Sequence, residues 1–144
     1  MSKHYANAVW NGNLAGGNGK YQLQTSGFEN GYTFPSRFEN DKKQSSPEEL
    51  IGAACASCFS MAFAHELDQA GFKPSSIQTE AEVTLDKVGG GFGITNIALK
   101  TQGKVSGITE NKFLEIANTA KENCPVSQAL KATKIELASS VLVQ

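Results

Sequence analysis

The chain has very little arginine and no long uninterrupted hydrophobic segment. Arg37 is the single Arg among 13 basic residues, and the others are Lys. No apolar run approaches the roughly 20 residues that a bilayer crossing needs, and the first residues form no apolar stretch of the kind that a secretory signal has. We therefore expect a cytoplasmic protein without a membrane partner.

A strong charge of either sign is also missing. Thirteen basic residues oppose 14 acidic ones, which leaves a net charge of -1. Lys42 and Lys43 form the only basic cluster, whereas binding to a polyanion requires a basic face. We therefore expect no nucleic-acid partner.

Cysteine is scarce, with three residues, Cys55, Cys58 and Cys124. In a cytosolic chain such thiols indicate redox or metal chemistry rather than a framework of structural disulfides. A structural zinc site needs four ligands, and His4 and His65 are isolated in the sequence. His65 also lies seven helical residues from Cys58, about 10 Å along the axis, which disfavours a Cys-His hydrolase. We expect no metal and no bound cofactor.

The length of 144 residues fits a single domain spanning residues 1–144. Short alternating stretches up to about Phe38 predict an antiparallel meander. A helix is predicted over Pro47–Ala70, because Ser46 is a good N-cap, Glu49 completes a capping box and Gly71 suits the left-handed position after the helix. Since its interior is apolar almost all round, we expect a buried central helix.

Apolar periodicity and turn residues predict the rest of the chain. The elements are strands at Ile77–Leu85 and Phe92–Leu99, a helix from Thr109 to Asn123, a helical turn over Cys124–Leu130 and a strand over Lys134–Val143. The apolar stripe of the second helix consists of Phe113, Ile116, Ala117 and Ala120. The fold class expected is α+β, with two antiparallel β portions packed around the buried central helix.

Two of the thiols are candidates for redox chemistry. Cys124 precedes Pro125 in an N-cap-like position, where Ser, Thr, Asp or Asn would cap better and where helix N–H groups favour a thiolate. Its presence there indicates a role for sulfur itself. Cys58 lies in the middle of an apolar helix and by itself would be interpreted as an inert core group. Cys55 is interpreted as core filler.

Arg37 and Glu48 form a second pair of candidates. Arg37 lies between Phe34 and Phe38, where its planar fork can hold a carboxylate and an anion, or where its stem can simply cover the two rings. Glu48 is not needed for the capping box and is free to orient Arg37. Ten residues of helix separate Glu48 from Cys58 by about 15 Å along the axis, so a shared site requires a second, antiparallel copy of the helix, as in a two-fold homodimer.

Four segments in order carry a family resemblance. They are Arg37–Glu39, Ser46–Ala62 with Cys58 inside it, Val83–Phe92 and Cys124–Gln128. With these segments the chain resembles, over nearly its whole length, the OsmC/Ohr family of thiol peroxidases, and it is most similar to the OsmC branch.

The resemblance implies an intertwined α+β homodimer with sites at the subunit interface. It implies that Cys58 is the peroxidatic cysteine, that Cys124 is the resolving cysteine, and that Arg37 and Glu48 hold the thiolate. It further implies an antioxidant, stress-response peroxidase that prefers organic hydroperoxides to H₂O₂ and is regenerated by an external dithiol such as dihydrolipoamide on a carrier protein. Cys55 stands where a non-sulfur residue is usual in the family, which leaves open whether a side disulfide competes.

Two other functions remain open at this level. A redox sensor of the same fold would be oxidised once without turning over. A metal-binding protein would use Cys55, Cys58 and His65.

Overall fold

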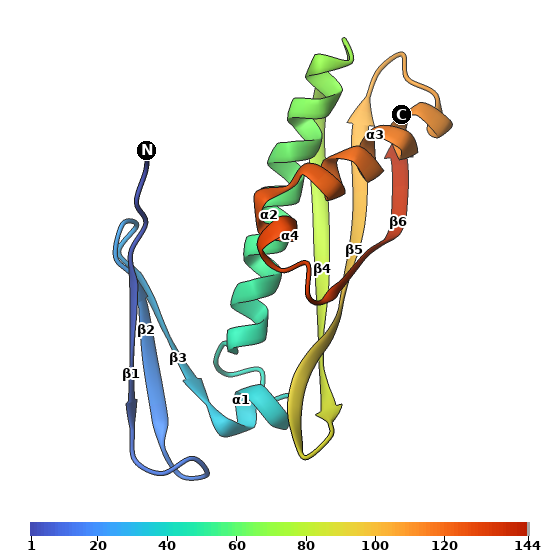
Figure 1. Cartoon of the computed structure of the whole chain (residues 1–144). Helices are drawn as coiled ribbons and strands as arrows, with labels where there is room; N and C mark the ends of the chain where they lie inside the picture. Colours follow the sequence, from blue (N-terminus) through green and yellow to red (C-terminus); the bar gives the residue numbers. More distant parts are fainter. Residues whose placement is uncertain (144) are drawn as a thin grey trace. The chain divides into compact units, whose positions relative to one another are not determined.

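The computed structural model describes residues 1–143 and forms two compact units, Met1–Leu50 and the residues from Ile51 on. The first unit contains β1 (Ala6–Asn11), β2 (Asn18–Leu23), β3 (Phe28–Thr33), α1 (Phe34–Phe38) and the start of α2 (Pro47–Gln69). The second unit contains the rest of α2, β4 (Pro74–Val88), β5 (Gly91–Val105), α3 (Glu110–Asn123), α4 (Pro125–Ala129) and β6 (Lys134–Val143) (Figure 1).

The first unit is built on the predicted antiparallel meander. β1 pairs with β2 and β2 pairs with β3, both antiparallel. The sequence analysis did not predict α1, which follows β3 directly. Thr33 and Ser36 form a reciprocal capping box at its start, with Ser36 N–H donating to Thr33 Oγ1 at 3.2 Å and Thr33 N–H donating to Ser36 Oγ at 2.9 Å. This cap turns the chain so that Arg37 lies on a helix.

Ser45 ties the loop between α1 and α2 back to the first sheet. Its N–H donates to the carbonyl of Gly31 at 3.1 Å, and its hydroxyl lies 3.1 Å from the Tyr21 hydroxyl and 2.9 Å from the Asn30 amide nitrogen. Ser36 Oγ also donates to the Ser45 carbonyl at 2.7 Å. These bonds determine where α2 begins with respect to α1.

The central helix α2 confirms the predicted N-cap at Ser46 and the left-handed glycine after the helix. Glu49 N–H donates to Ser46 Oγ at 3.1 Å, as an N-cap serine requires. At the other end Gly71 has φ of 86°, and Phe72 N–H reaches the Leu67 carbonyl at 2.9 Å. This is the Schellman arrangement, in which a left-handed residue satisfies the last carbonyls of a helix.

Burial on α2 is confined to one face of the helix. The buried residues are Glu48, Gly52, Cys55, Phe59, Phe63 and Leu67. The opposite face is open in the single chain and consists of Ala53, Ala54, Ser57 and Met61, with Met61 76% exposed. The expectation of burial almost all round is therefore wrong for the chain by itself.

By length and composition alone, α2 would pass as a membrane-crossing helix, which the sequence analysis did not expect. Its apolar residues are interrupted by Gly52, Ser57, Ser60 and His65, so no unbroken apolar run of that length is visible in the sequence. The large side chains on its buried face pack in the core of the second unit, as in the core helix of a soluble protein.

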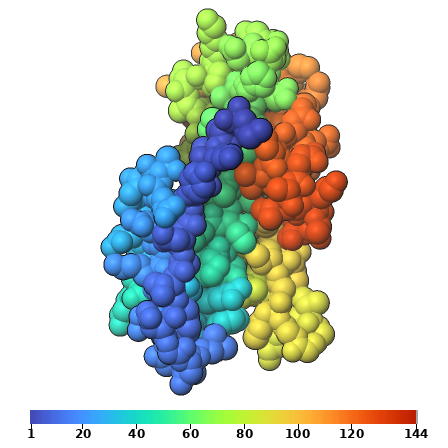
Figure 2. Space-filling view, turned by 60° about the vertical axis from the view of Figure 1, so that its left-hand side comes forward, coloured from blue at the N-terminus to red at the C-terminus, as the bar shows by residue number. Residues whose placement is uncertain are grey.

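The second sheet has the order β4-β5-β6. β4 and β5 form the predicted antiparallel hairpin, and β5 continues past the predicted end at Leu99 to Val105. The turn between β4 and β5 contains Gly89, which has φ of 59°, and this end of the hairpin lies at the surface (Figure 2, yellow). β6, however, pairs with β5 in parallel, so the expectation of two antiparallel β portions is wrong for this strand. The reason is the helical connection through α3 and α4. It returns the chain to the end of the sheet at which β5 begins, so β6 runs in the same direction as β5.

The core of the second unit lies between the sheet and two helices, α2 and α3, which cover the same face (Figure 1). The four residues predicted as the apolar stripe of α3 are its buried residues. Thr109 caps α3 as predicted, accepting from Lys112 N–H at 3.3 Å. Phe63 of α2 packs against Phe113 of α3 with ring centroids 4.9 Å apart. This contact holds the C-terminal part of the chain against α2.

Candidate active site

The two candidate redox thiols meet in the second unit. Cys58 lies in the middle of α2, and Cys124 lies at the junction that ends α3 and begins α4. Their Sγ atoms are 3.0 Å apart although 66 residues separate them in the chain. Both are free thiols, and a disulfide requires the sulfurs to approach by only about 1 Å more. The structure therefore brings together the pair that the sequence analysis singled out.

The packing of α3 against α2 positions Cys124. Ala117 and Ala120 of α3 are fully buried in the core, and Asn123, the last residue of α3, donates from Nδ2 to Glu66 Oε1 of α2 at 2.9 Å. Cys124 N–H donates to the Ala120 carbonyl at 2.9 Å. Pro125 then begins α4, because it needs no hydrogen-bond acceptor and its fixed φ suits the first helical position.

The three thiols differ in exposure. Cys124 is fully buried and Cys55 is 1% exposed, whereas Cys58 is partly exposed. A reagent from solution therefore reaches the Cys58 sulfur more readily than either neighbour. Cys55 belongs to the core cluster around Phe59, in agreement with its interpretation as core filler.

The surroundings shift the thiol pKa values in opposite directions. Burial raises the pKa of Cys58, and its hydrogen bond to Cys124 raises it further. Burial also raises the pKa of Cys124. Its hydrogen bond with Cys58, the backbone N–H and hydroxyl of Ser127, and the backbone N–H of Val126 together outweigh burial and lower this pKa. Burial raises the pKa of Cys55, as do the charges that Cys124 and Cys58 would carry. Within one chain Cys124 is therefore the more readily ionised thiol of the pair.

Arg37 and Glu48 also meet, within the first unit. Arg37 donates from Nε at 2.9 Å and from Nη2 at 2.8 Å, and both bonds end on the same oxygen, Glu48 Oε1. The Glu48 side chain is 8% exposed and the Arg37 side chain 42%. The Arg37 guanidinium also lies 5.2 Å from the centre of the Phe38 ring. Arg37 therefore pairs with a carboxylate and also lies over one of the two flanking aromatic rings, and its role in binding an anion stays a prediction.

The Arg37–Glu48 pair keeps unused binding capacity. Glu48 Oε2 is buried and has no hydrogen-bond partner among residues 1–143. Arg37 also lines an apolar surface pocket of about 230 Å³ in the first unit. The other lining residues are Trp10, Leu14, Tyr32, Thr33, Phe34, Phe38 and Pro47. Such a pocket can accept an apolar group beside the guanidinium.

The three residues of the alternative metal site do not assemble. In the part of the chain that the structure describes, no three His, Cys, Asp or Glu side chains are placed to hold a metal ion. The set of Cys55, Cys58 and His65 is therefore not a preformed metal centre.

Sequence reasoning missed Val126 and Ser127. Both act on the sulfurs of the thiol pair, Val126 through its N–H and Ser127 through its N–H and hydroxyl. The sequence contained a signal for both, because Val126 and Ser127 are the second and third residues after the N-cap-like Cys124. The N–H groups at these two positions face the side chain of an N-cap residue.

Comparison with known proteins gives a consistent result. The family model described as OsmC-like protein matches residues 40–138. The chain is 49% identical over 126 residues to Peroxiredoxin OsmC of Escherichia coli (strain K12), which covers 87% of each chain. The same figures hold for Peroxiredoxin OsmC of Shigella flexneri.

Solved structures share the fold. An organic hydroperoxide resistance protein from Elizabethkingia anophelis is 22% identical with a TM-score of 0.75, covering 99% of each chain. The organic hydroperoxide resistance protein OhrB of Bacillus subtilis is 23% identical with a TM-score of 0.73, covering 96% of this chain and 98% of that one. At these identities the likeness concerns the fold, whereas the family model and the two curated relatives place the chain itself in the OsmC family.

Proposed function

We propose that this thiol peroxidase of the OsmC family reduces organic hydroperoxides with Cys58 and Cys124, within one domain spanning residues 1–144. The observation that carries the proposal is the 3.0 Å separation of the two sulfurs. Organic hydroperoxide resistance is the activity named for the structural neighbours of Elizabethkingia anophelis and Bacillus subtilis, and it supports the choice of substrate class.

The proposed reaction begins at the partly exposed thiol. The Cys58 thiolate attacks one peroxide oxygen, the O–O bond breaks, and the organic part takes up a proton and leaves as an alcohol. Cys58 is then a sulfenic acid. The Cys124 thiolate attacks the Cys58 sulfur and expels hydroxide, which leaves as water, so that a disulfide forms. The short distance between the sulfurs supports this second step.

The first step needs a cation near Cys58, because its own chain raises the pKa of that thiol. We assign this task to Arg37, held by Glu48. The two N–H groups of Arg37 bound to one carboxylate oxygen leave part of the guanidinium free to bind an anion. A neighbouring cation favours a thiolate.

Glu48 and Cys58 belong to the same helix, ten residues apart, or about 15 Å along the axis. The proposed site therefore combines Arg37 and Glu48 of one copy with the thiol pair of another, in a homodimer. The open face of α2 supports this assembly, because small side chains allow two helices to approach closely. Its residues are Ala53, Ala54, Ser57 and Met61.

The apolar pocket beside Arg37 supports a preference for organic hydroperoxides. Burying an apolar group there gains about 25 cal/mol for each Å² removed from water, a gain that H₂O₂ cannot obtain. A peroxide whose organic part enters this pocket would present its O–O group close to the guanidinium.

Regeneration is assigned to an external dithiol, such as dihydrolipoamide on a carrier protein, in the cytoplasm. A dithiol can reopen the Cys58–Cys124 disulfide by exchange and leave as a disulfide itself. No bound cofactor is needed for any of these steps.

The test is steady-state reduction of cumene hydroperoxide with a dithiol. Cys58→Ser should abolish consumption. Cys124→Ser should reduce one peroxide per chain and then stop, because no disulfide forms. Cys55→Ala, the matched control, should turn over like the parent chain. Full steady activity of either Cys58→Ser or Cys124→Ser would contradict the assigned roles, and a parent chain that is oxidised once without turnover would be a redox sensor.

A further inference from the structure

Ser127, in α4, has a buried hydroxyl that forms no hydrogen bond with the rest of the described fold. The residue is 8% exposed, and its Oγ has no hydrogen-bond partner of full geometry among residues 1–143. An unsatisfied buried hydroxyl costs about 1–3 kcal/mol. It is the third residue after Cys124, in the first turn of α4, where backbone N–H groups point toward the cap side chain. The Ser127 hydroxyl and the Cys124 sulfur are thus both buried at the start of α4, and this hydroxyl is among the groups that lower the pKa of the Cys124 thiol.

The two bonded sulfurs of the proposed disulfide are not equivalent. Cys124 is fully buried behind α3 and α4, while Cys58 is partly open to solvent. A thiolate that attacks a disulfide approaches one sulfur and expels the other as an anion. The buried sulfur can leave only if its negative charge is stabilised inside the protein, because an unpaired charge in an apolar core is strongly disfavoured.

We propose that Ser127 is a positioning residue that holds the departing Cys124 sulfur as a thiolate, so that the reductant attacks Cys58. This inference rests on the proposed function, since it concerns the disulfide of that reaction. It assigns each sulfur a separate part in regeneration, with Cys58 bonding to the reductant and Cys124 leaving.

The electrostatics agree with this assignment. Burial raises the pKa of Cys124, yet Cys58, the Ser127 N–H, the Ser127 hydroxyl and the Val126 N–H together lower it. The pKa of Cys58 is raised. Exchange is faster when the leaving thiol has the lower pKa, so both exposure and charge favour attack at Cys58.

A thiolate of the dithiol bonds to the Cys58 sulfur as the Cys58–Cys124 bond breaks, and the electron pair of that bond leaves with Cys124. The second thiolate of the dithiol then attacks the dithiol sulfur that is bonded to Cys58 in this mixed disulfide, and the Cys58 thiolate is released. The dithiol loses two electrons and becomes a disulfide, while the protein disulfide gains two and becomes two thiols.

The test uses the full chain with Cys55→Ala, which leaves two thiols, oxidised with diamide so that the disulfide is made without peroxide. A limiting amount of glutathione is added, the reaction is stopped with acid, free thiols are blocked with N-ethylmaleimide, and peptides are identified by mass spectrometry. We expect glutathione on Cys58 and the block on Cys124.

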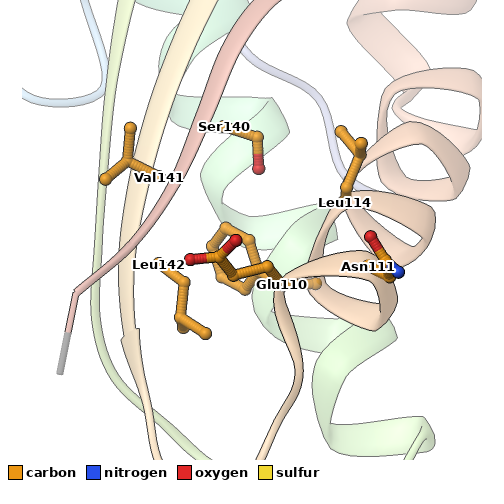
Figure 3. A pocket seen from close by; sticks show the side chains of 7 residues that line it. Glu110, Asn111, Leu114, Ser140, Val141 and Leu142 are labelled. Atoms are coloured by element: carbon orange, nitrogen blue, oxygen red, sulfur yellow. The ribbon is translucent and has the colours of Figure 1, made fainter.

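Three variants separate Ser127 from a general structural effect. Ser127→Ala should slow reduction of the disulfide by dithiothreitol about threefold to tenfold and move part of the glutathione to Cys124. Ser127→Thr, which keeps the hydroxyl, should restore both. Ser140→Ala is the matched control: its hydroxyl oxygen is also buried without a partner in the described chain, but it lines a pocket between α3 and β6 (Figure 3). Its rate should match that of the parent.

Glutathione on Cys124 in the parent, or an unchanged rate and adduct in Ser127→Ala, would overturn the inference. Failure of diamide to join the two thiols would overturn both this inference and the proposed disulfide. Glutathione on Cys58 in a chain that does not consume peroxide would refute the proposed peroxidase function and leave the role of Ser127 standing.

Discussion

Arg37→Lys is the most informative single substitution, because it keeps the positive charge and removes the fork. Arg37 donates two bonds to Glu48 Oε1, at 2.9 and 2.8 Å. A lysine ammonium reaches that oxygen as a point charge and cannot reproduce the planar arrangement. We therefore expect the variant to lose one of the two bonds to Glu48 and the defined orientation of the cation.

The magnitude follows from the geometry and the exposure. A hydrogen bond to a charged group contributes about 1.5–3 kcal/mol. Because 42% of the Arg37 side chain is exposed, solvent screening reduces the expected loss to about 1 kcal/mol. For a chain of this size that loss corresponds to a melting temperature lower by about 3 °C. Turnover should fall by about tenfold, because a misplaced catalytic cation costs more than its contribution to stability.

The assay combines thermal unfolding with cumene hydroperoxide turnover in a double-mutant cycle. Arg37→Lys, Glu48→Gln and the double variant should show a coupling energy of about 1 kcal/mol in stability. The control is Lys20→Gln, which removes an exposed ion pair with Glu29. The side chains of Lys20 and Glu29 are 60% and 50% exposed, so this variant should change stability by less than about 0.5 kcal/mol. An Arg37→Lys variant with parental turnover would refute the role of the guanidinium fork and leave Arg37 as a surface residue.

Three further predictions concern pH, assembly and the core. The raised pKa of Cys55 means that its neutral thiol stabilises the fold below the ordinary value of 9.0 and that this contribution is lost as the pH rises through the folded value. Urea midpoints of the reduced chain should therefore fall above pH 9 more steeply than those of Cys55→Ala, and parallel curves would contradict this. Met61→Glu, on the open face of α2, should give a folded monomer by sedimentation with little turnover, whereas a dimer of normal activity would show that this face is not the interface. Phe113→Ala should cost about 3–5 kcal/mol in urea unfolding, because its buried ring packs on Phe63; a loss below 1 kcal/mol would contradict the described core.

The candidate site illustrates the division between local and long-range information. The likeness of Cys124 to an N-cap and the mid-helix position of Cys58 were readable from neighbouring residues. The distance between their sulfurs was not, because it depends on how α3 packs against α2, where Phe113 meets Phe63. The effect of Ser127 on Cys124 was readable in principle, since capping geometry is local.

The sequence by itself determined the helix boundaries at Ser46, Gly71 and Thr109 and the buried stripe of α3, because caps, left-handed residues and apolar periodicity act within one or two turns of the backbone. Only the tertiary structure decided that β6 runs parallel to β5, that one face of α2 stays open and that Cys58 meets Cys124. These features depend on which apolar faces bury one another, and such contacts join residues far apart in the chain, whose pairing no local pattern encodes.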